Sequence, residues 1–262
     1  MFVNPVIPSA TLPKRSGDPS RLEEGPSPLR RLPAGCGEPF ELKQSWYVAG
    51  KRMMDVLLVL VLSLAALPIL LVAALLVRLT SRGPAFYSQV RLGRHGQPFS
   101  IYKLRTMYHD CERVSGACWS QPGDPRVTRL GSFLRATHLD ELPQLWNILL
   151  GDMSLVGPRP ERPEFAPTLE RVIPEYRSRL LVRPGVTGLA QVQLPPDSDI
   201  TSVRLKVAHD LDYIRHFSGW LDLRILICTI FHVFGLPCHA LCRALLGTER
   251  ELFPASLPSA NE

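Results

Sequence analysis

Two adjacent carboxylates, Asp140 and Glu141, come at the start of an apolar helical pattern, and an arginine between two prolines, Arg159, follows them. Upstream, Lys103 and Arg105 alternate along a predicted strand, which places both side chains on one face. Arginine and lysine bind phosphate oxygens, while a carboxylate can serve as base, metal ligand or nucleophile. These residue types therefore indicate chemistry on a phosphate-containing ligand.

The same residues also have a purely structural interpretation. Pro143 constrains where the next helix begins, which predicts Asp140 at or near its N-cap and Glu141 in its first turn. Carboxylates stabilise that position in many helices through the helix dipole. The two cations of the strand are equally consistent with solvated charges. A cap and a catalytic role are compatible, because a helix N-terminus also offers free N–H groups to phosphate.

Two Gly- and Pro-containing segments follow the carboxylates. Residues 151–160, with the sequence GDMSLVGPRP, predict a rigid loop in which Pro158 and Pro160 restrict the backbone around Arg159. This restriction lowers the ordering cost of presenting an arginine to an oxyanion, although a plain surface loop is the alternative. Residues 183–189 predict a tight turn whose glycines permit close approach or positive φ.

A long apolar segment precedes the candidate site. Residues 56–77 are uncharged and mostly apolar, which is long enough to cross a bilayer, and basic residues flank them on both sides. Pro68 near the centre predicts a break, and the two basic flanks give no clear direction for a single crossing. Two helices within residues 46–82, separated by a break at Pro68 and together entering one leaflet and returning, satisfy both observations. An ordinary kinked transmembrane helix remains the alternative.

The rest of the pattern predicts a mostly α fold, of the α+β type, with one short β-hairpin. Residues 85–91 and 99–105 predict the two strands of the hairpin around a Gly-containing turn. Residues 201–217 predict an amphipathic helix, and residues 223–236 a helix too short and polar to span, suited to the membrane interface. The predicted body therefore covers residues 83–236 and includes interfacial helices.

The two ends of the chain have a different composition. Eight prolines in the first 39 residues predict a disordered arm over residues 1–45, and residues 237–262 predict a tail. The formal net charge is +6, and 25 of the 30 basic residues are arginine, which favours bidentate binding of phosphate or carboxylate. Nucleic acid fits the charge but not the apolar segment, and no nucleic-acid-binding motif is present.

Taken together, these motifs resemble those of the monotopic phosphoglycosyl transferases, the bacterial sugar transferase family, in its short form. The resemblance extends from about residue 51 to residue 236. Its motifs are KRMMD at 51–55, GP at 83–84, YKLRTM at 102–107, DELPQLWN at 140–147, GDMSLVGPRP at 151–160 and RPGVTG at 183–188. One departure is Leu67, which precedes Pro68 where family members often have serine.

The resemblance implies a monotopic membrane protein with a re-entrant helix, at the bacterial inner membrane, with its catalytic face in the cytoplasm. It implies a UDP-sugar donor, a polyprenyl (undecaprenyl) phosphate acceptor and Mg²⁺, in the first membrane step of exopolysaccharide or O-antigen-type synthesis. Asp140 would be nucleophile and metal ligand, forming an aspartyl-phosphosugar, and Glu141 would assist. Lys103, Arg105 and the Pro158-Arg159 segment would bind phosphate or donor.

Other readings stay open at this point. A non-catalytic member that binds lipid phosphate, or that serves as a scaffold in polysaccharide assembly, is the alternative function. Release of nucleotide monophosphate from a donor in the presence of Mg²⁺ would separate the two. Membrane lipids are expected partners, nucleic acid is not, and a homodimer is compatible with the sequence. The sugar, the polyprenol length and the role of the arm are not encoded in any recognised motif.

Overall fold

The computed structural model describes residues 45–109, 111, 123–195, 199–233 and 245–246. Nearly all of the predicted arm, residues 1–45, and of the predicted tail, residues 237–262, lies outside these described residues. The described elements are mostly helical, as predicted. In chain order they are α1 (Ser45–Thr80), β1 (Phe86–Leu92), η1 (Arg94–Gly96), β2 (Pro98–Leu104), α3 (Arg129–Ala136), η2 (Leu139–Glu141), α4 (Gln144–Leu150), β3 (Ser154–Val156), α5 (Ala166–Val172), η3 (Tyr176–Leu181), β4 (Gly185–Thr187), α6 (Leu189–Gln193), α7 (Ile200–Arg215) and α8 (Gly219–Val233).

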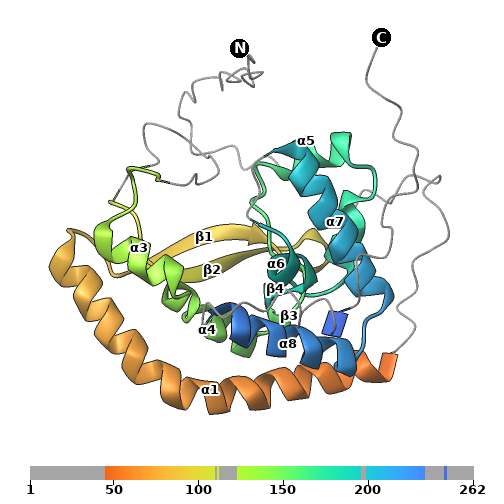
Figure 1. The fold of residues 1–262 in the computed structure, drawn as a ribbon, viewed down its shortest axis with the longest axis horizontal. Helices are drawn as coiled ribbons and strands as arrows, with labels where there is room; N and C mark the ends of the chain where they lie inside the picture. Colours follow the sequence, from red (N-terminus) through yellow and green to blue (C-terminus); the bar gives the residue numbers. More distant parts are fainter. Residues whose placement is uncertain (1–44, 110, 112–122, 196–198, 234–244, 247–262) are drawn as a thin grey trace, which may run out of the picture. The chain divides into compact units, whose positions relative to one another are not determined.

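The apolar segment forms a single helix, α1, that runs through Pro68 without ending. The predicted break into two helices at this proline is therefore wrong, and Figure 1 shows a continuous, curved helix instead. A proline removes one backbone donor and displaces one carbonyl, which bends a helix while the hydrogen bonds on either side persist. The predicted limits, residues 46 and 82, agree with the helix to within two residues.

Polar side chains bind the first half of α1 to the elements that follow it. Lys51 donates to Asp222 of α8, and the two groups are almost completely buried. Ser154 Oγ of β3 donates to Asp55 Oδ2 across 2.7 Å, and Arg52 donates to the last carbonyls of α4. Buried charges of this kind are stable only when paired, so the register of α1 on the body is fixed.

The second half of α1 returns to the same body through apolar contacts. Ala73 and Val77 pack with Leu104 of β2 and Leu134 of α3 in a small buried cluster. Between Val59, which is fully buried, and Ala73, most apolar side chains of α1 are exposed, and Leu64 is 80% exposed. By length and composition α1 is sufficient to cross a membrane, and 11% of its most apolar window is buried.

The hairpin forms as the sequence predicts. β1 and β2 pair antiparallel, with Phe86 opposite Leu104 and Leu92 opposite Pro98. Its turn contains two residues with positive φ, His95 at 58° and Gly96 at 75°.

Asn147 of α4 fixes the hairpin beside the predicted carboxylates. Its Nδ2 donates to the Ser100 carbonyl across 2.7 Å, and its Oδ1 accepts from the Tyr102 N–H across 3.1 Å. The side chain is fully buried, so these bonds replace water and hold β2 in place. Lys103, the next residue along β2, is thereby brought to the turn that precedes α4.

The two predicted loops at 151–160 and 183–189 each contain a short strand. β3 and β4 pair in parallel, with Ser154 opposite Gly185 and Val156 opposite Thr187. A Cβ on Gly185 would lie 2.1 Å from the Gly157 nitrogen, and one on Gly188 would lie 2.3 Å from the Gly157 carbonyl oxygen. The glycines therefore permit close approach of two backbones, as the sequence predicted. Strands of three residues are too short to produce a period-two pattern, which is why they were not predicted.

The last two helices cover this pair of strands. α7 agrees with the predicted amphipathic helix, whereas α8 begins at Gly219, four residues before its predicted start. Asp222 on this first turn of α8 is buried and accepts from Tyr213 of α7 across 2.8 Å. Trp220 and Ile230 on its other face are exposed, by 61% and 57%. An exposed apolar face on a short helix fits the predicted interfacial position.

Candidate active site

The carboxylate pair lies in the 3₁₀ turn η2 rather than at the start of α4. α4 begins at Gln144 with Pro143 as its N-cap, so the predicted N-cap role of Asp140 is wrong. The helical backbone is interrupted just before Asp140 and Glu141, because His138 adopts the left-handed conformation with φ 56° and ψ 15°. Left-handed backbone at a residue other than glycine is uncommon and costs energy, which is characteristic of functional sites.

Glu141 is held by two cations that the sequence also singled out. Its Oε1 accepts from Lys103 Nζ across 2.8 Å and from an Arg159 guanidinium nitrogen across 2.7 Å. Burial alone would raise the pKa of Glu141, but Arg159 and Lys103 together hold this pKa well below its usual range. Glu141 is therefore ionised, and it fixes both cations beside its neighbour.

Asp140 has the opposite electrostatic environment. The residue is 7% exposed, and burial raises the pKa of Asp140 to about 6, partly offset by Lys103. Glu141 adds to the increase through repulsion between the two carboxylates. Adjacent carboxylates with widely separated pKa values are typical of sites in which the two groups have different roles.

This environment makes a prediction about stability. The pKa of Asp140 is higher in the folded protein than in the unfolded chain, so stability falls as the pH rises from the ordinary value of 3.8 to about 6, and the full cost is present above that. At pH 8 the cost approaches ~3 kcal/mol. We expect Asp140→Asn to raise Tm by several degrees at pH 8 and by much less at pH 3, where Asp140 is protonated in both the folded and the unfolded chain. A thermal-unfolding series over pH checks this, and an equal gain at both pH values would contradict it.

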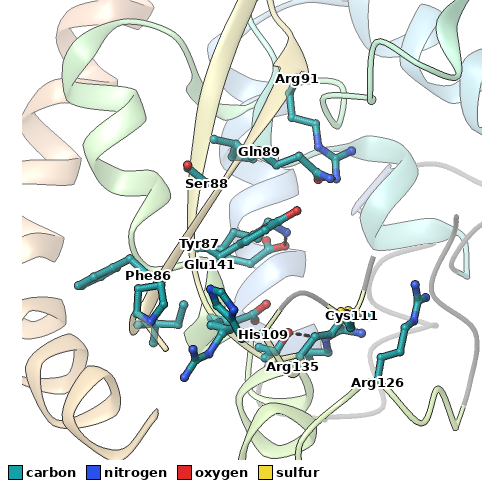
Figure 2. A pocket seen from close by; sticks show the side chains of 18 of the residues that line it. Phe86, Tyr87, Ser88, Gln89, Arg91, His109, Cys111, Arg126, Arg135 and Glu141 are labelled. Carbon is teal, nitrogen blue, oxygen red and sulfur yellow. Dashed lines mark hydrogen bonds and ion pairs between the residues drawn. The ribbon is translucent and has the colours of Figure 1, made fainter. Parts of the chain in front are cut away.

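The pair opens into a cavity of about 770 Å³. Side chains of β1 line it together with Glu141, among them Tyr87, Gln89 and Arg91, as Figure 2 shows. Arg126 and Arg135 line it from the other side. The cavity has the size of a typical small-ligand site, and its many arginines suit a ligand with several phosphate oxygens.

Backbone carbonyls of four consecutive residues fix the loop that carries Arg159. The carbonyl of Pro158 accepts from the Gly185 N–H across 2.9 Å, and that of Glu161 accepts from the Leu92 N–H across 2.9 Å. The carbonyls between them accept from arginine side chains: Arg179 donates to that of Arg159 across 2.9 Å, and Arg91 to that of Pro160 across 3.2 Å. Every carbonyl from 158 to 161 is thus bonded, so the loop holds Arg159 rigidly.

Arg179 is itself fixed by a buried acid. Its guanidinium lies 2.6 Å from Asp210 Oδ2 of α7, and each side chain is 2% exposed. A buried arginine needs such a partner, because an unpaired charge there would be strongly destabilising. Arg179, Asp210 and Arg91 contribute to the site but were not predicted from the sequence. In the sequence these three are recognisable only as charged residues near apolar ones, and this pattern does not indicate which groups they contact.

The structure thus brings together Asp140, Glu141, Lys103 and Arg159, with Pro158 in the supporting loop. Arg105 also lines the cavity, but its guanidinium donates to the carbonyls of Ser81 and Arg82 after α1, across 2.8 Å and 2.7 Å. Its assignment to phosphate therefore stays a prediction, and its observed role is to tie the end of α1 to the hairpin.

The carboxylate oxygens of Asp140 and Glu141 could hold one hard cation such as Mg²⁺. No group of three or more histidine, cysteine or acidic side chains forms a metal cluster in the described part of the chain. Mg²⁺ usually takes only one or two carboxylates and completes its coordination with water and substrate phosphate. Since both cations occupy Glu141 Oε1, Asp140 is the carboxylate best placed for that role.

A carboxylate pair with opposed pKa values, held by cations at a cavity in a protein with a long apolar helix, fits a membrane-associated group-transfer enzyme. Residues 46–235 match the bacterial sugar transferase family. The chain belongs to this family.

Named relatives agree with this assignment. The chain is 47% identical over 182 residues to UDP-glucose:undecaprenyl-phosphate glucose-1-phosphate transferase of Caulobacter vibrioides, covering 69% of this chain and 68% of that protein. It is 44% identical over 184 residues to UDP-N-acetylgalactosamine-undecaprenyl-phosphate N-acetylgalactosaminephosphotransferase of Aeromonas hydrophila, covering 70% of this chain. It is 41% identical over 185 residues to the exopolysaccharide production protein PSS of Rhizobium leguminosarum, covering 69% of this chain and 92% of that protein. The chain spans 43% of the length of the Aeromonas relative.

Proposed function

We propose that this protein transfers a sugar-1-phosphate from a UDP-sugar to undecaprenyl phosphate in two steps. The Asp140 carboxylate attacks the β-phosphorus of the donor, and the bond from that phosphorus to the departing uridine monophosphate breaks. An oxygen of the acceptor phosphate then attacks the same phosphorus, the bond to Asp140 breaks, and the carboxylate is restored. Splitting one displacement into two in this way is established chemistry for carboxylate nucleophiles.

The observation that carries this proposal is the division of labour within the pair. Glu141 is engaged by Lys103 and Arg159, so it organises charge and is unsuited to attack. Asp140 lines the cavity and forms neither of those ion pairs. Arg159 and Lys103 would stabilise the negative charge that develops on the phosphate oxygens. Mg²⁺ held by Asp140 and the diphosphate would supply further charge neutralisation.

The membrane arrangement follows from the two attachments of α1. Its 36 residues are about 54 Å long at 1.5 Å per residue, more than the ~30 Å of a bilayer core. Contacts near Asp55 and near Val77 both reach the same body, which supports a helix whose exposed middle enters one leaflet and whose ends stay on the cytoplasmic side. Labelling of Ala49→Cys and Arg82→Cys in a cysteine-free background should find both on that side, and opposite sides would refute the arrangement.

A donor panel tests the function. Purified protein in detergent or nanodiscs, with Mg²⁺ and undecaprenyl phosphate, should release uridine monophosphate from one or a few UDP-sugars and form the matching lipid-linked sugar. A scaffold that only binds lipid phosphate would release none from any donor. Family members differ in the sugar they accept, so the panel should include UDP-glucose and UDP-N-acetylgalactosamine, the sugars in the names of two relatives.

A further prediction concerns Arg179, which we expect to influence the reaction by positioning Arg159. One guanidinium nitrogen of Arg179 contacts both Asp210 and the Arg159 carbonyl. Lysine keeps a charge for Asp210, but its side chain is shorter and lacks the planar guanidinium, so its ammonium would not reach both partners at these distances. We expect Arg179→Lys to lower kcat by about tenfold to a hundredfold, since small displacements of a clamp are costly. Unfolding temperature should change little. The matched control is Arg177→Lys in the exposed pair with Glu170.

The readout separates positioning from general destabilisation. A role through Arg159 predicts that kcat falls more than the donor KM rises, because the clamp acts mainly as charge develops. Loss of folded protein would instead reduce the active fraction and leave both constants of the remaining enzyme unchanged. Unchanged kcat and KM of the remaining folded enzyme, or full activity, would show that Arg179 only stabilises the core and does not position Arg159.

A further inference from the structure

A second cavity, of about 530 Å³, lies on the other side of the Glu141–Arg159 ion pair. It is walled by residues of α4, β4, α6 and α8, whereas the first cavity is walled by the hairpin and α3. Five residues line both cavities: Arg91, His138, Glu141, Arg159 and Glu161. The ion pair that organises the site is therefore a shared wall, accessible from two directions.

The second cavity differs from the first in chemistry. Its wall is largely apolar, built from side chains of four separate elements or their ends: Leu142, Leu145, Val186, Val192, Leu194 and Val233. Among the residues that the structure describes, the ionisable members of its lining apart from the shared wall are Lys206 of α7 and His232 of α8. A ligand that fits this arrangement is mostly apolar, with a small anionic end directed to the shared wall.

Two histidines stand where the apolar wall meets the ion pair. The rings of His138 and His232 lie 5.9 Å apart between centroids, and both line the cavity. His138 is held in the left-handed conformation two residues before Asp140, just after α3 ends at Ala136. A neutral imidazole offers one N–H donor, and a pair of them can hold two oxygens of a phosphate group.

We infer that this second cavity is the acceptor site: it takes a phosphate monoester bearing a long apolar chain, with the phosphate beside the neighbouring rings of His138 and His232 and the chain against the apolar wall. The inference rests on the proposed function. Donor and acceptor then reach the phosphorus on Asp140 from opposite sides of Glu141 and Arg159. One acceptor oxygen forms the new bond to phosphorus, the bond to Asp140 breaks, and no oxidant or further reactant is needed.

Ping-pong kinetics provide a selective test, because kcat/KM for each substrate reports its own half-reaction. His232→Ala removes one phosphate donor, and Val233→Trp fills part of the apolar wall from the same helix. Both side chains are partly exposed, so neither change should prevent folding. We expect each to lower kcat/KM for undecaprenyl phosphate by about tenfold or more, and kcat/KM for the UDP-sugar by less than about twofold.

Matched controls come from outside the cavity lining. Leu223→Trp places the same bulk elsewhere on α8, and His216→Ala removes an exposed histidine at the end of α7. Both controls should leave the two kinetic constants near wild type. Variants of the cavity that lower both constants equally, or lower neither, would overturn the acceptor site while the wild-type kinetics still support the proposed function. Absence of nucleotide release by the wild type would overturn the proposed function and the acceptor site with it.

Discussion

Asp140→Ala should abolish sugar-phosphate transfer, with a loss on the order of 10⁴-fold or more. The side chain is buried, faces the larger cavity and forms neither of the ion pairs that engage Glu141. Removing it takes away the atom that would bond to phosphorus, and no neighbouring residue can replace it. The measurement is uridine monophosphate release together with formation of the lipid-linked sugar.

The controls for Asp140 separate chemistry from folding. Asp140→Asn keeps the shape of the side chain and, by the argument from its raised pKa, should be more stable than wild type at pH 8. It should therefore be folded and inactive at once. Asp212→Asn, a surface change in the pair with His216, should remain fully active. Transfer at the wild-type rate by Asp140→Ala or Asp140→Asn would show that Asp140 is not the nucleophile.

Glu141→Gln should have the second-largest effect, lowering transfer by about 10²- to 10³-fold. Glutamine has nearly the same shape but cannot neutralise Lys103 and Arg159, which would then face each other in a largely buried site. Removing one partner of such a group leaves an uncompensated charge, so stability should fall, by roughly 3 kcal/mol. Activity and thermal unfolding of the same preparation check both effects.

Neutralising Asp140 and neutralising Glu141 are therefore expected to have opposite effects on stability. Neutralising Asp140 relieves a cost of burial, whereas neutralising Glu141 removes the group that pairs two cations. If Glu141→Gln were as stable as wild type and as active, the ion pairs would not organise the site. If both variants lost stability equally, the assignment of different roles to the two carboxylates would be wrong.

Local pattern predicted much of this structure. The apolar length of α1, the hairpin, the amphipathic α7 and the close backbone approach at Gly185 and Gly188 all follow from short-range chemistry, and all are observed. The grouping of Asp140, Glu141, Lys103 and Arg159 was also predicted, in part from motifs. What brings them together is Asn147, whose two bonds to β2 set the hairpin beside the pair.

Other features depend on contacts between distant segments, which the sequence alone does not specify. Pro68 was predicted to end a helix, yet packing at both ends keeps α1 continuous. Asp140 was predicted as a cap, but the left-handed His138 moves the pair into a separate turn. Arg179 and Asp210 lie 31 positions apart, and their joint support of the Arg159 carbonyl becomes visible only in three dimensions.

The most direct test of the account is the mass of the enzyme during turnover. Protein given its UDP-sugar and Mg²⁺ without acceptor, then quenched rapidly in acid, should gain the mass of one sugar-phosphate, on the peptide that contains Asp140. The adduct should disappear when undecaprenyl phosphate is added, and it should be absent from Asp140→Asn. A wild-type enzyme that completes transfer without ever carrying this adduct, with kinetics requiring both substrates bound together, would contradict the proposed covalent step.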